Sequence, residues 1–175
     1  MRPLADRERI ERLIHALGEA AEQNVRIFLL GGTTAVLMGW RVTTIDVDFV
    51  MRPEDDAVLR AIPGLKETLQ INVETASPLD FIPIPVGWEE RGVFIERVRH
   101  AEFYHFDLIG QALAKLERGH HRDLDDVRAM LDRKLITGKD AREYFARIEP
   151  LLYRFPAIDS RTFRRAVDEA FGAHA

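Results

Sequence analysis

The first half of the chain alternates between helical and strand-like patterns of hydrophobic residues. Ile10, Leu13, Ile14 and Leu17 recur at helical spacing, which predicts an amphipathic helix over residues 5–22. The apolar run Val25–Leu30 predicts a buried strand. Gly31-Gly32 ends this run, and Thr33–Met38 then reads as a short helix.

Further strands are predicted between residues 45 and 99. Residues 45–50 alternate apolar and acidic side chains, which indicates a strand with one apolar and one carboxylate face. A proline followed by acids at Pro53–Arg60 marks the start of a helix. Three more segments favour strands: Ile71–Thr75, Leu79–Ile84 and Phe94–Arg99.

From Asp107 onward the hydrophobic pattern is helical. It predicts helices near 107–118, 122–134, 138–153 and 160–172, with Thr137 and Ser160 as N-caps. The fold class is therefore α/β, in the α+β sense. We expect a small mixed sheet with flanking helices in residues 1–105, and a helical region in residues 106–175 that packs on this core.

Composition narrows the function classes. The 175 residues contain no cysteine, which excludes disulfide scaffolds, zinc–thiolate sites, iron–sulfur clusters and cysteine nucleophiles. The formal net charge of −4 argues against a generic nucleic-acid coat protein. No apolar run reaches the ~18 residues of a membrane span, and the N-terminus is too charged for a signal peptide. We therefore expect a soluble, cytoplasmic protein.

Charge is unevenly distributed along the sequence. Residues 1–90 hold 9 Lys/Arg and 15 Asp/Glu, whereas residues 91–175 hold 16 and 14. Two interpretations stay open. The second half could face a polyanion while the first carries a metal-binding acidic cluster, or the difference could be ordinary surface variation.

Asp46 and Asp48 are the first candidate for chemistry. Two residues apart on a strand, both carboxylates point to the same side and repel each other. A bound Mg²⁺ would relieve that repulsion, since hard carboxylate oxygens are its preferred protein ligands. The alternative is an exposed strand face with solvated acids.

The turn Gly31-Gly32-Thr33-Thr34 is the second candidate, because it lies between a strand and a helix. Glycines let the backbone approach a phosphate closely, and a helix start offers free N–H groups. Threonine hydroxyls add donors. Taken alone, a Gly-Gly pair is usually only a turn, so its value comes from the acidic strand that follows.

The two candidates together resemble the signature of the nucleotidyltransferase superfamily with the DNA polymerase β-like fold. This signature consists here of Gly31-Gly32, thirteen intervening residues and Asp46-Val47-Asp48-Phe49. The resemblance implies that the glycine pair, with Thr33 and Thr34, holds a triphosphate and that Asp46 and Asp48 bind divalent metal. A third acid on a later strand usually completes such a site. Asp80 is the expected residue, and Glu74 is the alternative.

The second half extends the resemblance. Three segments are similar to the AbiEii/MenT-like bacterial nucleotidyltransferases and the related DUF6036-like group of unknown function. They are Asp107-Leu108, Lys115-Leu116-Glu117-Arg118-Gly119, and Arg122-Asp123-Leu124 followed by Asp126-Val127. Lys115 and Arg118 share a helix face, which implies triphosphate binding or, alternatively, a solvated surface. Asp123 and Asp126 are expected to orient Lys115, Arg118 or Arg122 through salt bridges.

These features predict an enzyme that transfers a nucleoside monophosphate from an NTP to a hydroxyl acceptor, with two Mg²⁺ ions held by Asp46, Asp48 and Asp80. The resemblance suggests tRNA as acceptor, a role as the toxin of a toxin–antitoxin pair, and a cognate antitoxin protein as partner. Two alternatives remain. One is a catalytically idle member that binds nucleotide or protein, and the other is a transferase acting on a small molecule such as an antibiotic.

Overall fold

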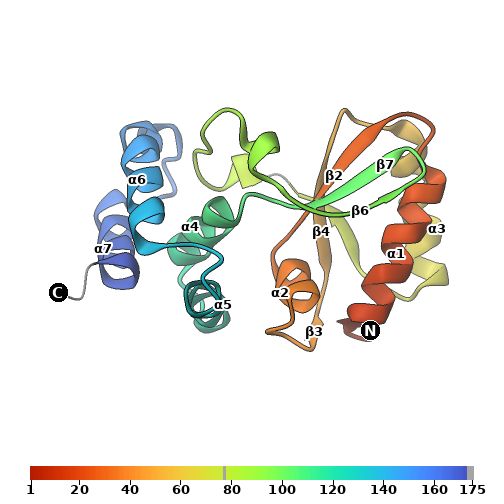
Figure 1. The fold of residues 1–175 in the computed structure, drawn as a ribbon, viewed down its shortest axis with the longest axis horizontal. Helices are drawn as coiled ribbons and strands as arrows, with labels where there is room; N and C mark the ends of the chain where they lie inside the picture. The colour runs from red at the N-terminus through yellow and green to blue at the C-terminus, as the bar shows by residue number, and fades with distance from the viewer. Residues whose placement is uncertain (77, 173–175) are drawn as a thin grey trace. The chain divides into compact units, whose positions relative to one another are not determined.

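The computed structural model describes residues 1–76 and 78–172. The chain divides into two compact units (Figure 1). Unit 1 consists of Met1–Ala76 and Gly92–Phe106, and unit 2 consists of Ser77–Arg91 and Asp107–Ala175. The expected boundary between residues 105 and 106 lies one residue before the third change of unit, between Phe106 and Asp107, and the structure also groups the segment 77–91 with the C-terminal helices.

Unit 1 is built on a mixed five-stranded sheet in the order β5-β4-β2-β7-β6. The strands are β2 (Val25–Leu30), β4 (Val47–Arg52), β5 (Val73–Thr75), β6 (Val93–Val98) and β7 (Ala101–His105). The central strand β2 runs antiparallel to β4 and parallel to β7, while β5 is parallel to β4. The mixed sheet expected from the sequence is therefore confirmed.

Helices of unit 1 cover one face of that sheet. They are α1 (Arg7–Ala20), α2 (Gly32–Met38) and α3 (Asp56–Thr68). Ile27, Phe49 and Phe103 lie on this face and are fully buried, together with Leu13 and Leu17 of α1. In Figure 1, α1 and α3 lie side by side next to the sheet. A separate two-stranded ladder, β1 (Ala5–Asp6) with β3 (Thr43–Thr44), ties the N-terminus to the segment before β4.

Unit 2 is helical. Its elements are η1 (Pro78–Asp80), η2 (Trp88–Arg91), α4 (Leu108–Arg118), α5 (His121–Asp132), α6 (Gly138–Ile148), η3 (Glu149–Arg154) and α7 (Ser160–Phe171). The four helices predicted after Asp107 are all present. The predicted helix 138–153 is shorter as an α-helix, because Pro150 cannot donate to the helical ladder and the chain continues as the 3₁₀ segment η3.

Two strand predictions were wrong. Leu79–Ile84 is not a strand, since Pro78–Asp80 forms a 3₁₀ turn. The hydrophobic pattern also failed to predict strand β7, which pairs with both β2 and β6. Along β7 the residues Ala101, Phe103 and His105 are buried and alternate with half-buried Glu102 and Tyr104. The polar side chains at alternate positions hid a central strand.

Two boundaries also differ from the sequence prediction. Strand β4 begins at Val47, so Asp46 immediately precedes it instead of lying within it. The N-cap of α7 is Asp159, whose carboxylate accepts a hydrogen bond from the backbone N–H of Thr162 at 2.8 Å, and not Ser160. The expected cap Thr137 is confirmed, because its hydroxyl accepts from the N–H of Asp140.

A buried carboxylate joins the two chain segments of unit 2. Asp107 accepts hydrogen bonds from Arg91 Nε at 2.6 Å, from the Tyr144 hydroxyl at 3.0 Å and from the backbone N–H of Gly110. Arg91 also donates to the carbonyls of Pro85 and Val86. This network explains why residues 77–91 belong with the helices.

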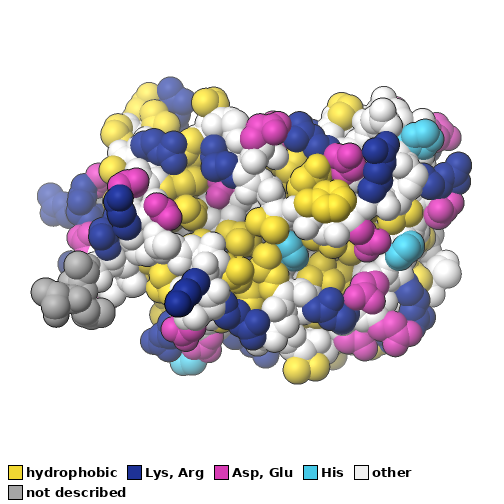
Figure 2. Space-filling model, viewed as in Figure 1, with side chains coloured by type: hydrophobic (Ala, Val, Ile, Leu, Met, Phe, Trp, Pro, Cys, Tyr) yellow, Lys and Arg dark blue, Asp and Glu magenta, His cyan; other side chains and the backbone are white. Residues whose placement is uncertain are grey.

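The folded units are more alike in charge than the two halves of the sequence. Unit 1 contains 11 Lys/Arg and 14 Asp/Glu, and unit 2 contains 14 and 15. Charges of both signs are interspersed on the face drawn in Figure 2. Of the helices in the described part of the chain, each is too short or too polar to cross a membrane.

Candidate functional site

The glycine turn of unit 1 lies next to the acidic strand. Gly31 follows β2 with φ of +67°, a conformation that L side chains rarely adopt. Leu30, the residue before it, pairs with Asp48 across the sheet. A Cβ atom on Gly31 would lie 3.6 Å from Asp48 Oδ2. The fold therefore brings together the two motifs that the sequence separates by thirteen residues.

Gly32 is required for a close approach of backbone to side chain. A Cβ atom there would lie 2.1 Å from Thr44 Oγ1 and 2.8 Å from Thr44 Cβ. Arg41 Nη1 would be 3.4 Å away from the same position. The loop that carries Arg41 and Thr44 thus lies directly against the glycine turn, which makes it part of the same site.

The candidate metal ligands of unit 1 are Asp46, Asp48 and Glu74. Asp46 and Asp48 are half-buried, and they flank the fully buried Val47. Glu74 on β5 pairs in register with Asp48 on β4, so the two side chains lie on the same face of the sheet. The backbones of neighbouring strands are about 4.8 Å apart. Glu74 is exposed. It is therefore the acid that unit 1 places beside Asp48.

Asp80 has a different position. It ends the 3₁₀ turn η1 and is exposed, and it belongs to unit 2. Unit 1 contains Asp46, Asp48 and Glu74, of which Asp48 lies beside the glycine turn, whereas Asp80 is described with the helices. Among the described residues, no three His, Cys, Asp or Glu side chains are close enough to form a ready-made metal cluster. A site in this part of the chain would draw further ligands from substrate or water.

The two threonines of the turn differ in their hydrogen bonds. Thr33 is fully buried, and within the described residues its hydroxyl oxygen has no hydrogen-bond partner. Thr34 is also fully buried, but its hydroxyl lies 3.4 Å from the carbonyl of Leu29 and 3.1 Å from His105 Nδ1. An unsatisfied buried hydroxyl is costly, so Thr33 is the better candidate for a ligand contact.

His105 is a residue of this site that the sequence reading missed. It ends β7, pairs in register with Leu29 and is only 6% exposed. Burial and the nearby charge of Arg7 both disfavour the imidazolium and lower the pKa of His105 to about 4. The ring is therefore neutral at physiological pH. The only signal for it was the alternation along β7, which polar residues obscured.

In unit 2 the predicted cation Lys115 is buried in ion pairs. Its Nζ lies 2.6 Å from Asp126 Oδ2 and 3.4 Å from Asp123 Oδ1, and Lys115 is 3% exposed. Arg118 makes two hydrogen bonds to Asp123, at 2.8 and 3.0 Å. The salt bridges expected for Asp123 and Asp126 are thus present.

The electrostatics of this cluster favour the charged form of Asp123. Burial by itself would raise the pKa of Asp123. Hydrogen bonds and charges from Arg118 and Lys115 outweigh that effect and hold the pKa below the ordinary value of 3.8. Asp123 is therefore ionised at neutral pH, and its ion pairs with Lys115 and Arg118 hold the start of α5 against the end of α4.

The fold and this site together define a class of enzyme. A mixed sheet, a strand–Gly-Gly–helix turn and carboxylates on the adjacent strands form the arrangement expected of a nucleotide-transferring enzyme. A family described as a nucleotidyltransferase of unknown function, DUF6036, matches residues 8–153. The chain therefore belongs to this nucleotidyltransferase family. No curated protein and no solved structure matched it.

Proposed function

We propose that the protein is a Mg²⁺-dependent enzyme that transfers a nucleoside monophosphate from an NTP to a hydroxyl group of RNA. One observation carries the proposal: the Asp48 carboxylate lies beside the Gly31 turn, 3.6 Å from the position of a Gly31 Cβ. Phosphates held at the turn would therefore lie next to a metal ligand. Nucleotidyl transfer requires that proximity.

The donor set of unit 1 suits magnesium. Mg²⁺ usually takes one or two carboxylates and completes its shell with water and substrate phosphates. Asp46 and Asp48 supply those carboxylates, with Glu74 as the neighbouring acid on β5. Asp80, the third acid expected from the sequence, belongs to unit 2 and stays a candidate beside Glu74. When bound, Mg²⁺ would neutralise charge on the donor phosphates.

Phosphate binding by the turn is supported by its backbone and by Thr33. Gly31 has a positive φ that L side chains rarely adopt, and a Cβ atom at Gly32 would overlap Thr44, so the turn has the close backbone packing that glycine allows in phosphate-binding turns. The unsatisfied Thr33 hydroxyl can donate to a phosphate oxygen. Thr34 has a different task, since its hydroxyl is hydrogen-bonded within unit 1. Lys115 and Arg118 are proposed to add positive charge toward the triphosphate.

The proposed reaction forms a bond between the acceptor hydroxyl oxygen and the α-phosphorus. The bond from that phosphorus to the bridging oxygen breaks, and pyrophosphate leaves. The hydroxyl proton passes to a carboxylate, for which Glu74 and Asp80 are the candidates. We propose tRNA as the first acceptor to test and a toxin role with a cognate antitoxin, because the Asp107–Val127 segments resemble the AbiEii/MenT-like group.

The proposal is tested by incubating the pure protein with each α-³²P-labelled NTP, Mg²⁺ and total tRNA. We expect label on RNA with one or more NTPs, no label from γ-³²P-labelled NTP, and loss of transfer in Asp48→Asn. Asp125→Asn is the matched control, because Asp125 is exposed on α5 and contacts only neighbouring side chains of that helix among its recorded ion pairs. Its activity should equal that of the wild type.

Comparison of Glu74→Gln with Asp80→Asn identifies the third acid. The variant that loses transfer by more than about tenfold while still binding NTP marks the residue that acts on the acceptor. Label on protein, or on an added aminoglycoside in place of RNA, would redirect the acceptor assignment. NTP binding without transfer to any acceptor would contradict the proposed activity.

A further inference from the structure

His105 and Thr34 form a buried polar pair beneath the glycine turn. Thr34 is fully buried and His105 is 6% exposed, and each side chain is hydrogen-bonded to the other, unlike the Thr33 hydroxyl, which is unpartnered among the described residues. The distance from His105 Nδ1 to Thr34 Oγ1 is 3.1 Å. A buried hydrogen bond between distant segments, here 71 residues apart, holds those segments in one relative position.

The direction of this hydrogen bond follows from the chemistry of its members. The carbonyl of Leu29 can only accept, so the single hydroxyl hydrogen of Thr34 is directed to it. With the Thr34 hydroxyl donating to Leu29, we assign the hydrogen of the neutral His105 ring to Nδ1, from which Thr34 Oγ1 accepts. The low pKa of His105, about 4, keeps the ring neutral and this arrangement intact.

Leu29 is the point at which this pair meets the rest of the turn. Its carbonyl accepts from the Thr34 hydroxyl and, at 2.8 Å, from the backbone N–H of Phe106. The end of β7 and the first turn of α2 are thus tied to one carbonyl, two residues before Gly31. The bond from His105 thus links the end of β7 to the first turn of α2.

The glycine turn has little tolerance for movement. Thr44 lies so close to Gly32 that even a methyl group would overlap it, and Asp48 lies beside Gly31. A shift of α2 by a few tenths of an ångström would change the distance between turn and carboxylate. Thr33, with its unsatisfied hydroxyl, would shift with the turn.

We propose that His105 is a positioning residue, which holds Thr34 and thereby fixes the Gly31-Gly32 turn and the Thr33 hydroxyl for binding the β- and γ-phosphates of the donor nucleotide. This inference rests on the proposed function, because it assumes that the turn binds the donor. His105 itself touches neither substrate nor metal. Its effect is transmitted through Thr34.

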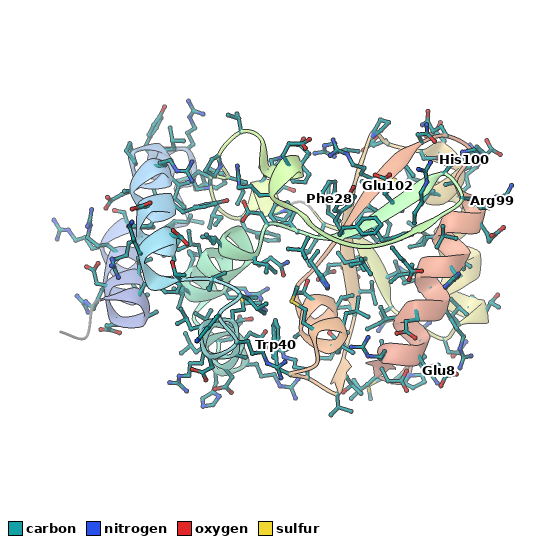
Figure 3. All side chains as sticks on the ribbon, viewed as in Figure 1. Glu8, Phe28, Trp40, Arg99, His100 and Glu102 are labelled. Carbon is teal, nitrogen blue, oxygen red and sulfur yellow. The ribbon has the colours of Figure 1, made fainter. Side chains whose placement is uncertain are left out.

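Three variants test the proposal. His105→Leu removes the donor at similar volume, and Thr34→Val removes the acceptor with little change of shape. His105→Asn restores a donor, since the amide nitrogen of asparagine occupies the place of Nδ1. His100→Leu is the matched control, because His100 is exposed at the turn between β6 and β7 (Figure 3). Thermal unfolding and circular dichroism establish that each variant is folded.

The readout is equilibrium binding of Mg²⁺-NTP and, separately, of the corresponding NMP. We expect His105→Leu and Thr34→Val to weaken NTP binding by about fivefold to tenfold, the effect of one buried hydrogen bond. NMP binding should change less than about twofold, because NMP lacks the β- and γ-phosphates. His105→Asn and His100→Leu should stay within about twofold of wild type. The double variant His105→Leu/Thr34→Val should be no weaker than either single variant.

Four results would overturn the positioning role. Equal weakening of NTP and NMP would indicate general destabilisation, and failure of His105→Asn to restore NTP binding would exclude the donor role of Nδ1. If His105→Leu does not fold, Thr34→Val and His105→Asn still decide the question. Absence of NTP binding by the wild-type protein contradicts the proposed function itself and the positioning role with it. Normal wild-type binding that His105→Leu leaves unchanged contradicts the positioning role alone.

Discussion

At Gly32 the backbone of α2 and the side chain of Thr44 are closer than any residue with a Cβ atom permits. Gly32→Ala would place a methyl group 2.1 Å from Thr44 Oγ1 and 2.8 Å from its Cβ. We expect the variant to lose about 1–3 kcal/mol of unfolding free energy through overpacking, and to bind NTP more weakly. Urea unfolding and equilibrium binding measure the two effects.

Gly64 provides a matched control of opposite sign. It lies within α3, and a Cβ atom there meets nothing within 4 Å. Glycine is unfavourable in a helix, so Gly64→Ala should stabilise the protein by about 0.5–1 kcal/mol. Equal destabilisation by Gly32→Ala and Gly64→Ala would show that the Thr44 contact does not explain the requirement for glycine.

His105 should make stability depend on pH between about 4 and 6.5. Its pKa is about 4 in the folded protein and 6.5 in an ordinary environment, so the unfolded chain binds the proton more readily in that window. Stability is then complete above pH 6.5 and falls as pH drops toward 4, by about 3 kcal/mol in total.

Urea unfolding at a series of pH values measures this contribution. His105→Asn cannot titrate, and we expect it to flatten the slope between pH 4.5 and 6.5. Asp123 has a lowered pKa, so its contribution is lost only as pH falls below about 4 and does not overlap with this window. A slope that persists in His105→Asn would assign the effect to other groups.

At the scale of elements, two cations of α4 pair with carboxylates of α5. Lys115 is the buried cation and Arg118 is the exposed one. Lys115→Met removes the ammonium group that lies 2.6 Å from the buried carboxylate of Asp126, and we expect a loss of about 3–5 kcal/mol. Arg118 has a side chain that is 54% exposed, so Arg118→Gln should cost less than about 1 kcal/mol.

The comparison of these two variants also separates stability from catalysis. If Lys115 acts only within the ion pairs, residual folded Lys115→Met should retain transfer activity per folded molecule. If Lys115 also binds phosphate, activity per folded molecule should fall more than about tenfold. Similar destabilisation by both variants would contradict the assignment of Lys115 as the buried partner.

At the scale of the whole chain, the two units interrupt each other. Residues 77–91 lie between β5 and β6 in sequence, but Arg91 is held by Asp107, which also accepts from Tyr144 of α6. A fragment ending at residue 106 keeps every strand of unit 1 and lacks both Asp107 and Tyr144. We expect trypsin to cleave this fragment after Arg91 much faster than the full chain.

Timed digestion with mass spectrometry locates the cuts. Tyr144→Phe in the full chain is the intermediate case, since Asp107 keeps its bond from Arg91 but loses about 1 kcal/mol of hydrogen bonding. Equal cleavage after Arg91 in fragment and full chain would show that the Asp107 network does not order the segment.

Local pattern determined much of this protein. Helical spacing predicted α1 and the helices after Asp107, the apolar run predicted β2, and Gly31-Gly32 with Asp46 and Asp48 indicated the class of enzyme. These features depend on residues close in sequence, where spacing alone states which side chains share a face. The tRNA acceptor, the toxin role and the third acid stay predictions, because the residues that recognise an acceptor carry no fixed spacing.

Tertiary structure decided what spacing could not. Pairing of β4 with β5 set Glu74 beside Asp48, and pairing of β7 with β2 brought His105 to Thr34 across 71 residues. Helix packing also tied Arg91 to Asp107, and it buried Lys115, whose salt bridges the sequence predicted but whose burial it did not. Sheet register and buried polar contacts arise only when distant segments meet. The sequence by itself therefore predicted a chemistry for this site, and the fold determined which of its residues are neighbours.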